Sequence, residues 1–549
     1  MLKENFVKTL ETSITSNWNF PALANYTEGY LSYGKVAEKI HLLHSIFKQS
    51  SIKQGDKVAV IGKNSVNWAI TYLATVSYGA VIVPILPDFK PEDVHHIVNH
   101  SDSVLFFTSE QIFDNLDETQ MPNLEAIFSL EKFSVFYSKK KEFVEHVQNA
   151  EQTHLQKYQA FTPEVVKFPD IKNDQLAAIV YTSGTTGFSK GVMLPHNSLM
   201  ANVRYAQRNM PLKAGDKLLS FMPLAHSYGC AFEFLFPFTL GCHITFLSKI
   251  PSPKIIVKAF QDVKPHLILS VPLIIEKIYK KHIKPALNKG AIKKIKKIPV
   301  LKNIVHKKVY AKLVDVFGGN FYEIVIGGAA LNKEVETFLT QIKFPFTIGY
   351  GMTECGPLVS YSAWNKRKLE TVGLPVDTLE VKIDSEDQEK IVGEILVRGE
   401  NVMDGYYKNE QATESTIDKD GWLHTGDLGL IDRDGHIYIK GRSKDMILGP
   451  SGQNIYPEEV EAKLNNMPFV QESLILDRSG SLIALVYPDL EMMDAENVSE
   501  TDIIKIMDDN RRDLNNQLPS YINLVKIELY PEEFEKTPTK KIKRFLHTI

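Results

Sequence analysis

One short segment combines glycines, hydroxyl side chains and a lysine in a way that suits a polyphosphate ligand. It runs from Tyr181 to Gly191, reads YTSGTTGFSKG, and directly follows the apolar run Ala177–Val180. Glycines let the backbone approach an anion closely, while hydroxyl and ammonium groups donate hydrogen bonds to phosphate oxygens. We therefore expect a loop that binds a nucleoside triphosphate. The contributing residues would be Thr182, Ser183, Gly184, Thr185, Thr186, Gly187 and Lys190.

This loop differs from the Walker A loop of P-loop NTPases. A Walker loop reads G-x-x-x-x-G-K-[ST], but counting from Gly184 places Ser189, Lys190 and Gly191 at the last three positions. A P-loop NTPase fold is therefore disfavoured. The alternative is a surface loop of small residues, which is disfavoured because such loops rarely place so many donors directly after a buried strand.

The elements that must hold this loop read as repeated strand–helix units. Lys57–Gly62 is an apolar run closed by glycine, a helical pattern passes through Trp68 and Tyr78, and Ala80–Leu86 is a second apolar run. Such a βαβ unit has parallel strands. Similar apolar runs occur at Val104–Phe107, Leu176–Thr182, Leu218–Met222, Ile244–Leu247, Leu267–Val271 and Ile324–Ile326. We expect an α/β fold whose large N-terminal domain contains two parallel-sheet α/β subdomains.

The chain changes character after Thr371, where short alternating segments are separated by turn signals. Glu394–Gly399 is one such segment, and two others flank Asp432–Gly435. We interpret Asp432–Gly435 as a hairpin turn and not as a calcium loop, because its glycine comes too early. Helical and strand patterns mix again towards the C-terminus. We expect a β-rich subdomain that completes an N-terminal domain of residues 1–443, and a small α+β domain of residues 444–549.

The segment Tyr181–Gly191 resembles the signature of the acyl-adenylate-forming superfamily of AMP-dependent synthetases and ligases, with Ser189 where proline is usual. Segments similar to the family's other motifs follow in the family's order, from Tyr30–Gly34 to Thr537–Arg544. The resemblance implies an enzyme that uses ATP, Mg²⁺ and coenzyme A. It would first join an acid to AMP with release of pyrophosphate, and then transfer the acyl group to the thiol of coenzyme A.

The resemblance also implies which residues bind the nucleotide. Glu354 would hold Mg²⁺ together with Thr185, and Asp427 would accept hydrogen bonds from both ribose hydroxyls, with Arg442 beside it. Taken singly, Asp427 could equally cap a turn, and Arg442 could be a solvated charge at a strand end. The residues that would contact the adenine and the α-phosphate are Gly328, Ala329, Ala330, Tyr350, Gly351, Met352 and Thr353.

Lys541 is the expected catalytic lysine, because the resemblance aligns it through Thr537 and Arg544. Its ammonium group would stabilise the charge that develops during adenylation without transferring a proton. Lys540 precedes it, where the family usually has glycine, so the neighbouring lysine and a solvated basic tail are the alternatives. The resemblance further implies a mobile C-terminal domain with its hinge at Lys444. Rotation would withdraw Lys541 and bring the coenzyme A-binding residues forward, namely Ser451, Gly452 and Gln453.

His226 stands where related synthetases have an aromatic residue or a histidine beside the acyl carboxylate. We assign it to the catalytic site, with a buried core histidine as the alternative. The apolar stretch Gly229–Leu247 follows, and its Glu233 and Gly241 favour a buried element, a glycine turn and a strand over a membrane span. Four phenylalanines in this stretch could line an acyl channel or belong to plain core: Phe232, Phe234, Phe236 and Phe238.

Charge is unevenly distributed along the chain. Lys and Arg number 63 against 66 Asp and Glu, a net charge of −3 that argues against a nucleic acid partner. The segment Lys277–Lys312 nevertheless contains 13 lysines and no acidic residue. Because basic segments attract anionic lipid head groups, we expect a peripheral membrane contact here, with a solvated helix surface as the alternative.

Val271–Tyr279 and the basic segment behind it resemble the long-chain branch of the superfamily, so we predict a long-chain fatty acid:CoA ligase. Medium-chain and aryl-CoA ligases and acyl-AMP ligases that load a carrier protein are alternatives. Another alternative is a non-catalytic nucleotide-binding protein of the same fold. It is disfavoured because the predicted site residues are all intact, namely Glu354, Asp427, Arg442 and Lys541. Three cysteines without metal-ligand spacing, and no apolar leader in the first 18 residues, favour a cytoplasmic location, with contact at the inner face of the membrane.

Overall fold

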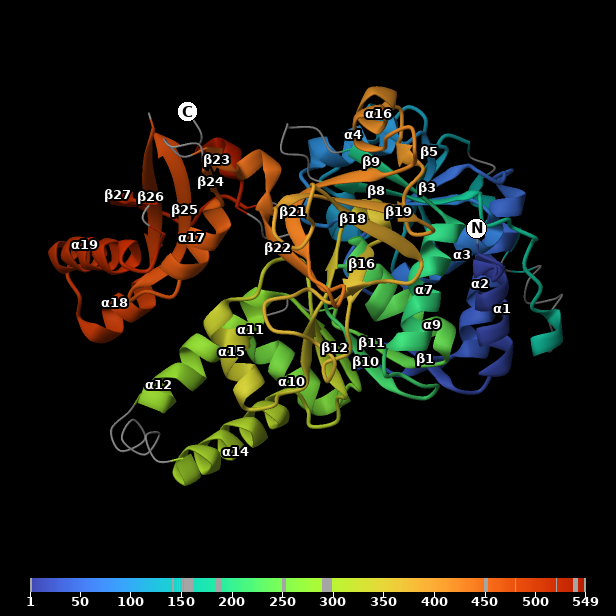
Figure 1. Ribbon diagram of the computed structural model, residues 1–549. Helices are drawn as coiled ribbons and strands as arrows, with labels where there is room; N and C mark the ends of the chain where they lie inside the picture. Colours follow the sequence, from blue (N-terminus) through green and yellow to red (C-terminus); the bar gives the residue numbers. More distant parts are fainter. Residues whose placement is uncertain are drawn as a thin grey trace.

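The computed structural model describes most of the chain and confirms the α/β fold (Figure 1). The described residues are 2–140, 143–145, 147, 149–150, 152, 161–182, 190–248, 253–288, 299–448, 453–478, 480–519, 521–536 and 542–547. Among them, no helix combines the length and the apolar character that crossing a bilayer requires.

The largest sheet contains eight strands in the order β20-β9-β8-β4-β3-β5-β6-β7. Strands β8, β4, β3, β5 and β6 run parallel, while β20, β9 and β7 pair antiparallel at its two ends. The bounds are β20 (Gly405–Tyr406), β9 (Lys190–Pro195), β8 (Leu176–Thr182), β4 (Val81–Ile85), β3 (Lys57–Ile61), β5 (Ser103–Thr108), β6 (Ala126–Ser129) and β7 (Val135–Ser138).

The predicted βαβ unit lies at the centre of this sheet. Helix α3 (Val66–Tyr78) connects β3 to β4 and packs on both strands. It begins where the Ser65 hydroxyl accepts a hydrogen bond from the backbone N–H of Trp68, and it ends at Gly79, whose positive φ of 86° suits glycine. Helices α1 (Phe6–Ser16), α2 (Tyr33–Gln49) and α7 (His196–Asn209) share the apolar core of α3, whereas α4 (Pro91–His100) packs on the other face of the sheet.

A second region of the N-terminal domain contains two further sheets, whose strands are mostly parallel. Its two sheets have the orders β10-β11-β1-β2 and β12-β13-β14, and β10 contacts β12. Helices α10, α11, α14 and α15 enclose an apolar core with strands β10, β12, β13 and β14. The bounds are β1 (Pro21–Asn25), β2 (Tyr30–Ser32), β10 (Lys217–Ser220), β11 (His243–Phe246), α10 (Pro253–Val263), β12 (Leu267–Ser270), α11 (Pro272–Ile278), α14 (Pro299–Val316), β13 (Glu323–Ile326), α15 (Lys333–Gln341) and β14 (Phe346–Ile348).

The segment from Tyr350 to Arg442 is β-rich, as predicted. Strands β15, β16 and β17 form one antiparallel sheet, and β18, β19, β21 and β22 form another. The bounds are β15 (Tyr350–Gly351), β16 (Leu358–Tyr361), β17 (Leu374–Pro375), β18 (Leu379–Asp384), β19 (Gly393–Gly399), β21 (Leu423–Ile431) and β22 (Ile437–Arg442).

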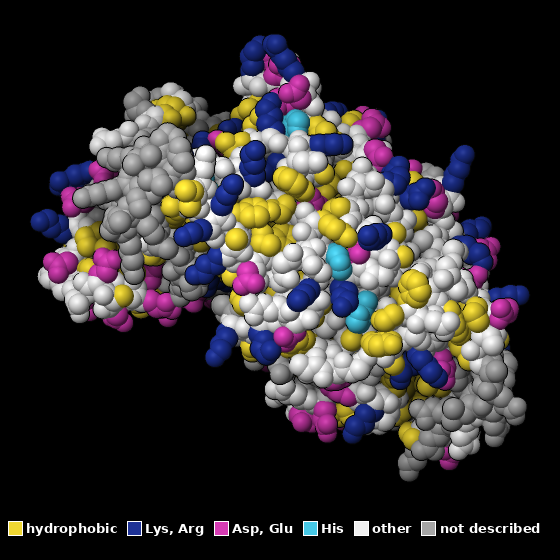
Figure 2. Space-filling view, turned by 90° about the horizontal axis from the view of Figure 1, so that it is seen from below, with side chains coloured by type: hydrophobic (Ala, Val, Ile, Leu, Met, Phe, Trp, Pro, Cys, Tyr) yellow, Lys and Arg dark blue, Asp and Glu magenta, His cyan; other side chains and the backbone are white. Residues whose placement is uncertain are grey.

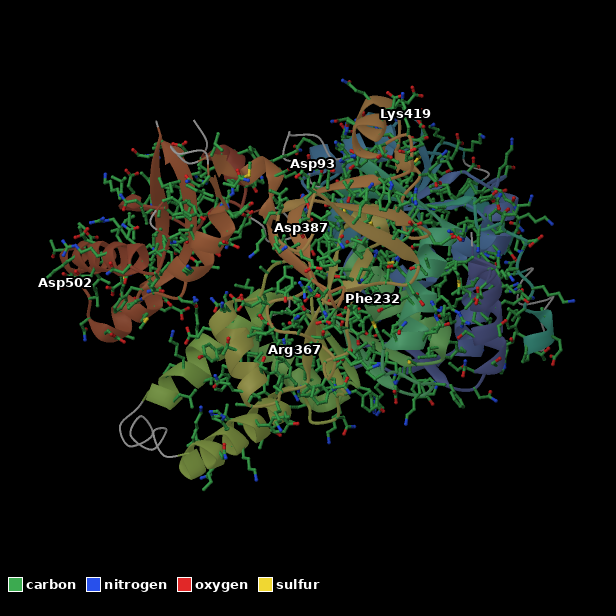
Figure 3. The ribbon with its side chains drawn as sticks, in the orientation of Figure 1. Asp93, Phe232, Arg367, Asp387, Lys419 and Asp502 are labelled. Atoms are coloured by element: carbon green, nitrogen blue, oxygen red, sulfur yellow. The ribbon has the colours of Figure 1, made fainter. Side chains whose placement is uncertain are left out.

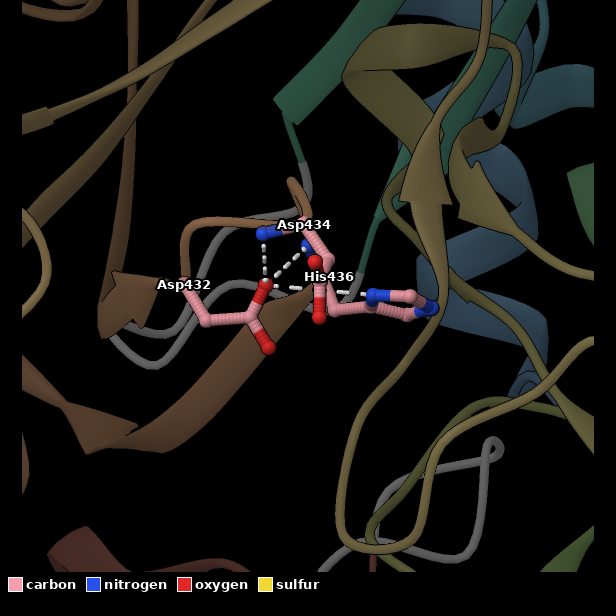
Figure 4. Close-up of side chains that lie close together, drawn as sticks. All are labelled: Asp432, Asp434 and His436. Carbon is pink, nitrogen blue, oxygen red and sulfur yellow. Dashed lines mark hydrogen bonds and ion pairs between the residues drawn. The ribbon is translucent and has the colours of Figure 1, made fainter.

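The hairpin turn between β21 and β22 is confirmed (Figure 4). One carboxylate oxygen of Asp432 accepts hydrogen bonds from the backbone N–H groups of Asp434 and His436, at 3.0 and 2.9 Å. The ammonium group of Lys368 lies 2.6 Å from the other oxygen of Asp432 and 3.4 Å from Asp434. A lysine of the protein therefore already neutralises these acidic groups, and we assign no cation to them.

The C-terminal part forms a smaller α+β unit, drawn in red beside the larger body (Figure 1). Its sheet has the order β25-β26-β27 and encloses its own apolar core with the helices α17 and α19. The bounds are β23 (Ile447–Leu448), β24 (Asn454–Ile455), α17 (Pro457–Leu464), β25 (Val470–Arg478), β26 (Ser481–Pro488), α18 (Leu490–Glu496), α19 (Glu500–Asn515) and β27 (Leu524–Leu529).

Candidate active site

A continuous cleft of about 4030 Å³ is lined by residues of both the N-terminal body and the C-terminal unit. It contains every nucleotide-site residue that the sequence predicted within the described ranges: Thr182, Lys190, Gly328, Ala329, Ala330, Tyr350, Gly351, Met352, Thr353, Glu354, Asp427 and Arg442. The predicted loop residues Ser183, Gly184, Thr185, Thr186 and Gly187 lie outside the described residues.

One corner of the cleft is built around Asp427, which is 5% exposed. The antiparallel register of β21 and β22 places it opposite Arg442, whose Nε lies 2.8 Å from its carboxylate. The hydroxyl of Tyr350 donates a 2.6 Å hydrogen bond to the other carboxylate oxygen. Burial, with the nearby Asp427 charge as a second cause, raises the pKa of Tyr350 well above its ordinary value, so this hydroxyl stays protonated. The arrangement fixes a carboxylate that can accept two vicinal hydroxyls.

A second corner holds Glu354, in the short helix η5 (Thr353–Cys355). Its carboxylate accepts a 2.9 Å hydrogen bond from the hydroxyl of Tyr406, and the ammonium group of Lys190 lies 4.6 Å from the centre of the Tyr406 ring. One anchored carboxylate can hold a Mg²⁺ ion that takes its remaining ligands from water and phosphate. The residues present therefore fit the expected metal.

Two glycines at this end of the cleft are required by the local backbone, one for its positive φ and one for a close approach. Gly328 follows β13 with a positive φ of 88°, which glycine adopts without strain. At Gly351, a Cβ atom would collide with the backbone carbonyl of Pro357. The residue types at both positions thus follow from local backbone geometry.

His226 also lines the cleft, and it begins the short helix α8 (Ser227–Gly229). Its Nδ1 accepts a hydrogen bond of 3.3 Å from the backbone N–H of Tyr228. This partly buried histidine therefore borders the cleft and is not a core residue.

Two side chains to which the sequence analysis gave no site role, Glu233 and Asn64, hold the loop preceding His226. The buried carboxylate of Glu233 accepts 2.9 Å hydrogen bonds from the backbone N–H groups of Phe221 and Met222. Asn64 accepts a hydrogen bond from the N–H of Leu224 at 3.0 Å and donates to the carbonyl of Met222 at 2.7 Å. Burial raises the pKa of Glu233 well above its ordinary value. The position of Glu233 inside an otherwise apolar run predicted a buried element, but not its bonds to this loop.

The four phenylalanines that follow His226 belong to plain core, so the acyl-channel alternative was wrong for them. Each is at most 1% exposed. The ring of Phe234 lies 6.4 Å from Trp68 and 5.8 Å from Tyr72, and Phe238 lies 4.8 Å from Tyr33. Figure 3 places Phe232 within the N-terminal body. Among described residues, apolar lining of the cleft comes from the second region instead, including Phe221, Leu247, Ile256, Phe260, Leu313 and Phe317.

The C-terminal unit borders the same cleft through the segment around the predicted catalytic lysine. Lys541, Ser451 and Gly452 lie outside the described residues, and Gln453 is exposed. Lys536 forms a β-bridge with Ile542, and Lys536, Ile542, Lys543 and Arg544 line the cleft. Lys444 is exposed and follows Arg442 by two residues, in the short helix η6 (Ser443–Asp445).

Comparison with known proteins gives a family and several relatives. The family model described as AMP-binding enzyme matches residues 10–407. The long-chain-fatty-acid–CoA ligase FadD15 of Mycobacterium bovis is 28% identical, over 90% of this chain and 86% of its own. The peroxisomal long chain acyl-CoA synthetase 6 of Arabidopsis thaliana is 30% identical, over 86% of this chain and 70% of its own.

Solved structures share the fold over the whole chain. The anthranilate CoA ligase AuaEII in complex with anthranoyl-AMP has a TM-score of 0.79 at 20% identity, covering 100% of this chain and 97% of that one. ATP-bound MatB from Rhodopseudomonas palustris has a TM-score of 0.77 at 20% identity, covering 99% and 98%. At this identity the likeness establishes the fold alone.

Proposed function

This chain belongs to the AMP-binding enzyme family, and on that premise we propose that it is a long-chain fatty acid:CoA ligase. The observation that carries the proposal is that one cleft is lined by Asp427, Glu354 and His226 and also by apolar side chains of the second region. We call the part lined by these apolar side chains the apolar branch. Long-chain acyl-CoA ligases among the relatives support the choice of acid.

In the first half-reaction, a carboxylate oxygen of the fatty acid attacks the α-phosphorus of ATP. The bond from that phosphorus to the bridging oxygen breaks, and pyrophosphate leaves with the electron pair. Asp427, oriented by Tyr350, holds the ribose. Glu354 would hold a Mg²⁺ ion, which would supply positive charge to neutralise the phosphates, and Lys541 stabilises the charge that develops in the transition state. His226 lies beside the acyl carboxylate.

In the second half-reaction, the sulfur of coenzyme A attacks the acyl carbonyl carbon. The bond from this carbon to the AMP oxygen breaks, the thiol proton is released, and acyl-CoA and AMP form. The C-terminal domain turns about Lys444 between the two steps, which withdraws Lys541 and brings the Ser451–Gln453 loop towards coenzyme A.

The acyl chain would occupy the apolar branch of the cleft, where Phe260 of α10 and Leu313 of α14 are 2% and 5% exposed. We expect Leu313→Trp to shorten this branch. Each methylene that loses its apolar contacts costs about 0.8 kcal/mol, so the preference for palmitate over hexanoate should fall roughly tenfold or more. The measurement is kcat/KM for both acids at saturating ATP.

The matched control for this change is Phe236→Leu, in the aromatic core that does not line the cleft. It should lower thermal stability but leave the palmitate-to-hexanoate ratio unchanged. An unchanged ratio in Leu313→Trp, or an equal change in Phe236→Leu, would place the acyl chain elsewhere.

The function itself is tested with the unaltered protein and a panel of acids. Acid-dependent exchange of pyrophosphate into ATP should be strongest with palmitate, weaker with hexanoate, and weakest with benzoate and anthranilate. Thioester formation should require coenzyme A and should not occur with a phosphopantetheinylated carrier protein. Strongest exchange with an aryl acid, or acyl transfer to the carrier alone, would select one of the alternative ligases.

We also propose that helix α14 contacts an anionic membrane surface from the cytoplasmic side. In this helix Lys307 and Lys308 are exposed, and so are Ile304 (48%) and Tyr310 (36%). Figure 1 places α10 and α14 at the lower side of the molecule. Figure 2 views the molecule from this side and shows Lys and Arg side chains interspersed with hydrophobic ones. A basic surface with exposed apolar side chains suits a headgroup region.

Reversing the charges of Lys307 and Lys308 to Glu should weaken binding to vesicles of phosphatidylcholine and phosphatidylserine. Each lysine near an anionic surface contributes about 1 kcal/mol, so we expect at least ~10-fold weaker partitioning in a sedimentation assay. Lys132→Glu with Lys419→Glu is the control, because both residues are exposed, lie outside α14 and change the net charge equally. Equal binding by both double variants would refute the membrane contact.

A further inference from the structure

The C-terminal end of helix α17 contacts the N-terminal body through two hydrogen bonds. The ammonium group of Lys280, in the short helix η4 (Tyr279–Ile283), donates to the backbone carbonyl of Asn465 at 2.6 Å. The side-chain amide of Asn332 donates to the side-chain oxygen of Asn466 at 2.5 Å. We call these four residues the α17 latch. Lys280 belongs to the basic segment, so part of this segment faces the C-terminal unit.

On the side of the N-terminal body, the latch is held in place by further bonds. Asn332 is 6% exposed and caps α15, because its side-chain oxygen accepts a 2.9 Å hydrogen bond from the N–H of Glu334. Its own backbone N–H donates to Glu276 at 2.9 Å. Burial lowers the pKa of Lys280, and the negative charge of Glu276, one helical turn earlier, opposes this shift. Interactions within the N-terminal body therefore position both donor side chains, Lys280 and Asn332, independently of the C-terminal unit.

On the side of the C-terminal unit, the two acceptor residues, Asn465 and Asn466, lie at the C-terminal end of helix α17. Asn465 is the residue that ends α17, so its carbonyl is one of the outward-pointing carbonyls at the negative end of the helix. A lysine ammonium is a favourable partner there. The side chain of Asn465 accepts a 2.8 Å hydrogen bond from the Ser473 hydroxyl, and that of Asn466 donates to the Ala462 carbonyl at 3.0 Å.

The latch lies near predicted site residues at both of its ends. Asn332 follows the predicted adenine-contacting residue Ala330 by two positions. In α17, Glu461 forms a 2.9 Å ion pair with Arg544, which also donates to the carbonyl of Ile475 at 3.0 Å. Arg544 lies three residues after Lys541. One helix therefore links the adenine end of the cleft to the segment that carries the catalytic lysine.

We propose that Lys280 and Asn332 are positioning residues that hold the C-terminal domain in its adenylating orientation. This rests on the proposed function, in which Lys541 serves the first half-reaction only. Both hydrogen bonds join surfaces that must separate when the domain turns, so the latch forms for adenylation and opens for thioester formation. Its removal should slow the first half-reaction selectively.

Two variants break the latch from different positions. Lys280→Met removes the ammonium group and keeps the side-chain length. Asn332→Asp keeps the oxygen that caps α15 but replaces the donor amide with a carboxylate that repels the oxygen of Asn466. We expect each to lower kcat for palmitate-dependent pyrophosphate exchange about 10-fold. The first variant loses a hydrogen bond of a charged group, and the second places a carboxylate opposite an amide oxygen. Formation of palmitoyl-CoA from supplied palmitoyl-AMP should be unchanged or faster.

The matched control is Lys284→Met, because Lys284 lies one turn after Lys280 and pairs with Glu334 of the N-terminal body at 2.9 Å. It should leave both half-reactions unchanged. Combining Asn332→Asp with Asn466→Lys supplies an opposite charge across the same contact and should restore exchange, which a purely structural role for Asn332 would not produce.

Normal exchange in both Lys280→Met and Asn332→Asp would overturn the latch, and so would an equal loss of both half-reactions. Absence of palmitate-dependent exchange in the unaltered protein would instead overturn the proposed function on which the latch rests. Survival of the second half-reaction reports that each variant is folded.

Discussion

Replacement of Lys541 by alanine should nearly abolish palmitate-dependent pyrophosphate exchange while leaving acyl transfer from supplied palmitoyl-AMP intact. The lysine ammonium group stabilises the negative charge that develops on the α-phosphate and the leaving pyrophosphate during adenylation. Thioester formation does not involve this charge, so it does not need the lysine. Loss of one such group typically costs 10²–10³-fold in rate, and we expect a loss of at least about that size. Exchange of labelled pyrophosphate into ATP measures the first half-reaction alone.

Lys540→Ala is the control, because it removes an equal charge from the adjacent position. It should retain most of the exchange activity. Exchange that persists in Lys541→Ala and disappears in Lys540→Ala would shift the assignment by one residue.

Replacement of Asp427 by alanine should raise KM for ATP about 10–100-fold, with a smaller effect on KM for palmitate. The carboxylate is 5% exposed and fixed by Tyr350 and Arg442 at 2.6 and 2.8 Å. A hydrogen bond that involves a charged group contributes about 1.5–3 kcal/mol, which corresponds to this range. The Arg442 side chain is 45% exposed, so water can solvate its charge and the fold should survive. Initial rates over a range of ATP concentrations provide the measurement.

Tyr350→Phe is the companion variant, since it removes only the hydroxyl that orients Asp427 and keeps the ring in the cleft. We expect a rise of a few-fold in KM for ATP. A KM for ATP within twofold of the original in Asp427→Ala would contradict the assignment of this carboxylate to the ribose.

Features that depend on local pattern were predictable from the sequence. The βαβ unit at Lys57–Ile85, the strand before the predicted phosphate loop and the hairpin at Asp432 each follow from a few neighbouring residues, and all three elements are present. The pairing of Asp427 with Arg442 also follows once the hairpin register is known. Motif order then identified residues of distant segments that line one cleft.

Contacts between distant segments were not predictable, because they depend on how whole elements pack. Tyr406 bonds to Glu354 across 52 positions of sequence, although no motif marked it. The four phenylalanines Phe232, Phe234, Phe236 and Phe238 have the composition of an acyl channel, yet each is at most 1% exposed, and Phe234 packs against Trp68 and Tyr72. The latch residues Lys280 and Asn332 were inconspicuous because their partners lie in another domain.

The central claim is that two half-reactions are joined by an acyl-adenylate, and the most direct test is to look for this intermediate. The protein is incubated with palmitate, ATP and Mg²⁺ without coenzyme A, quenched, and examined by mass spectrometry. We predict palmitoyl-AMP and pyrophosphate in equal amounts, followed on addition of coenzyme A by palmitoyl-CoA and AMP in equal amounts. Formation of ADP and phosphate, or of no adenylate with any acid of the panel, would contradict the account.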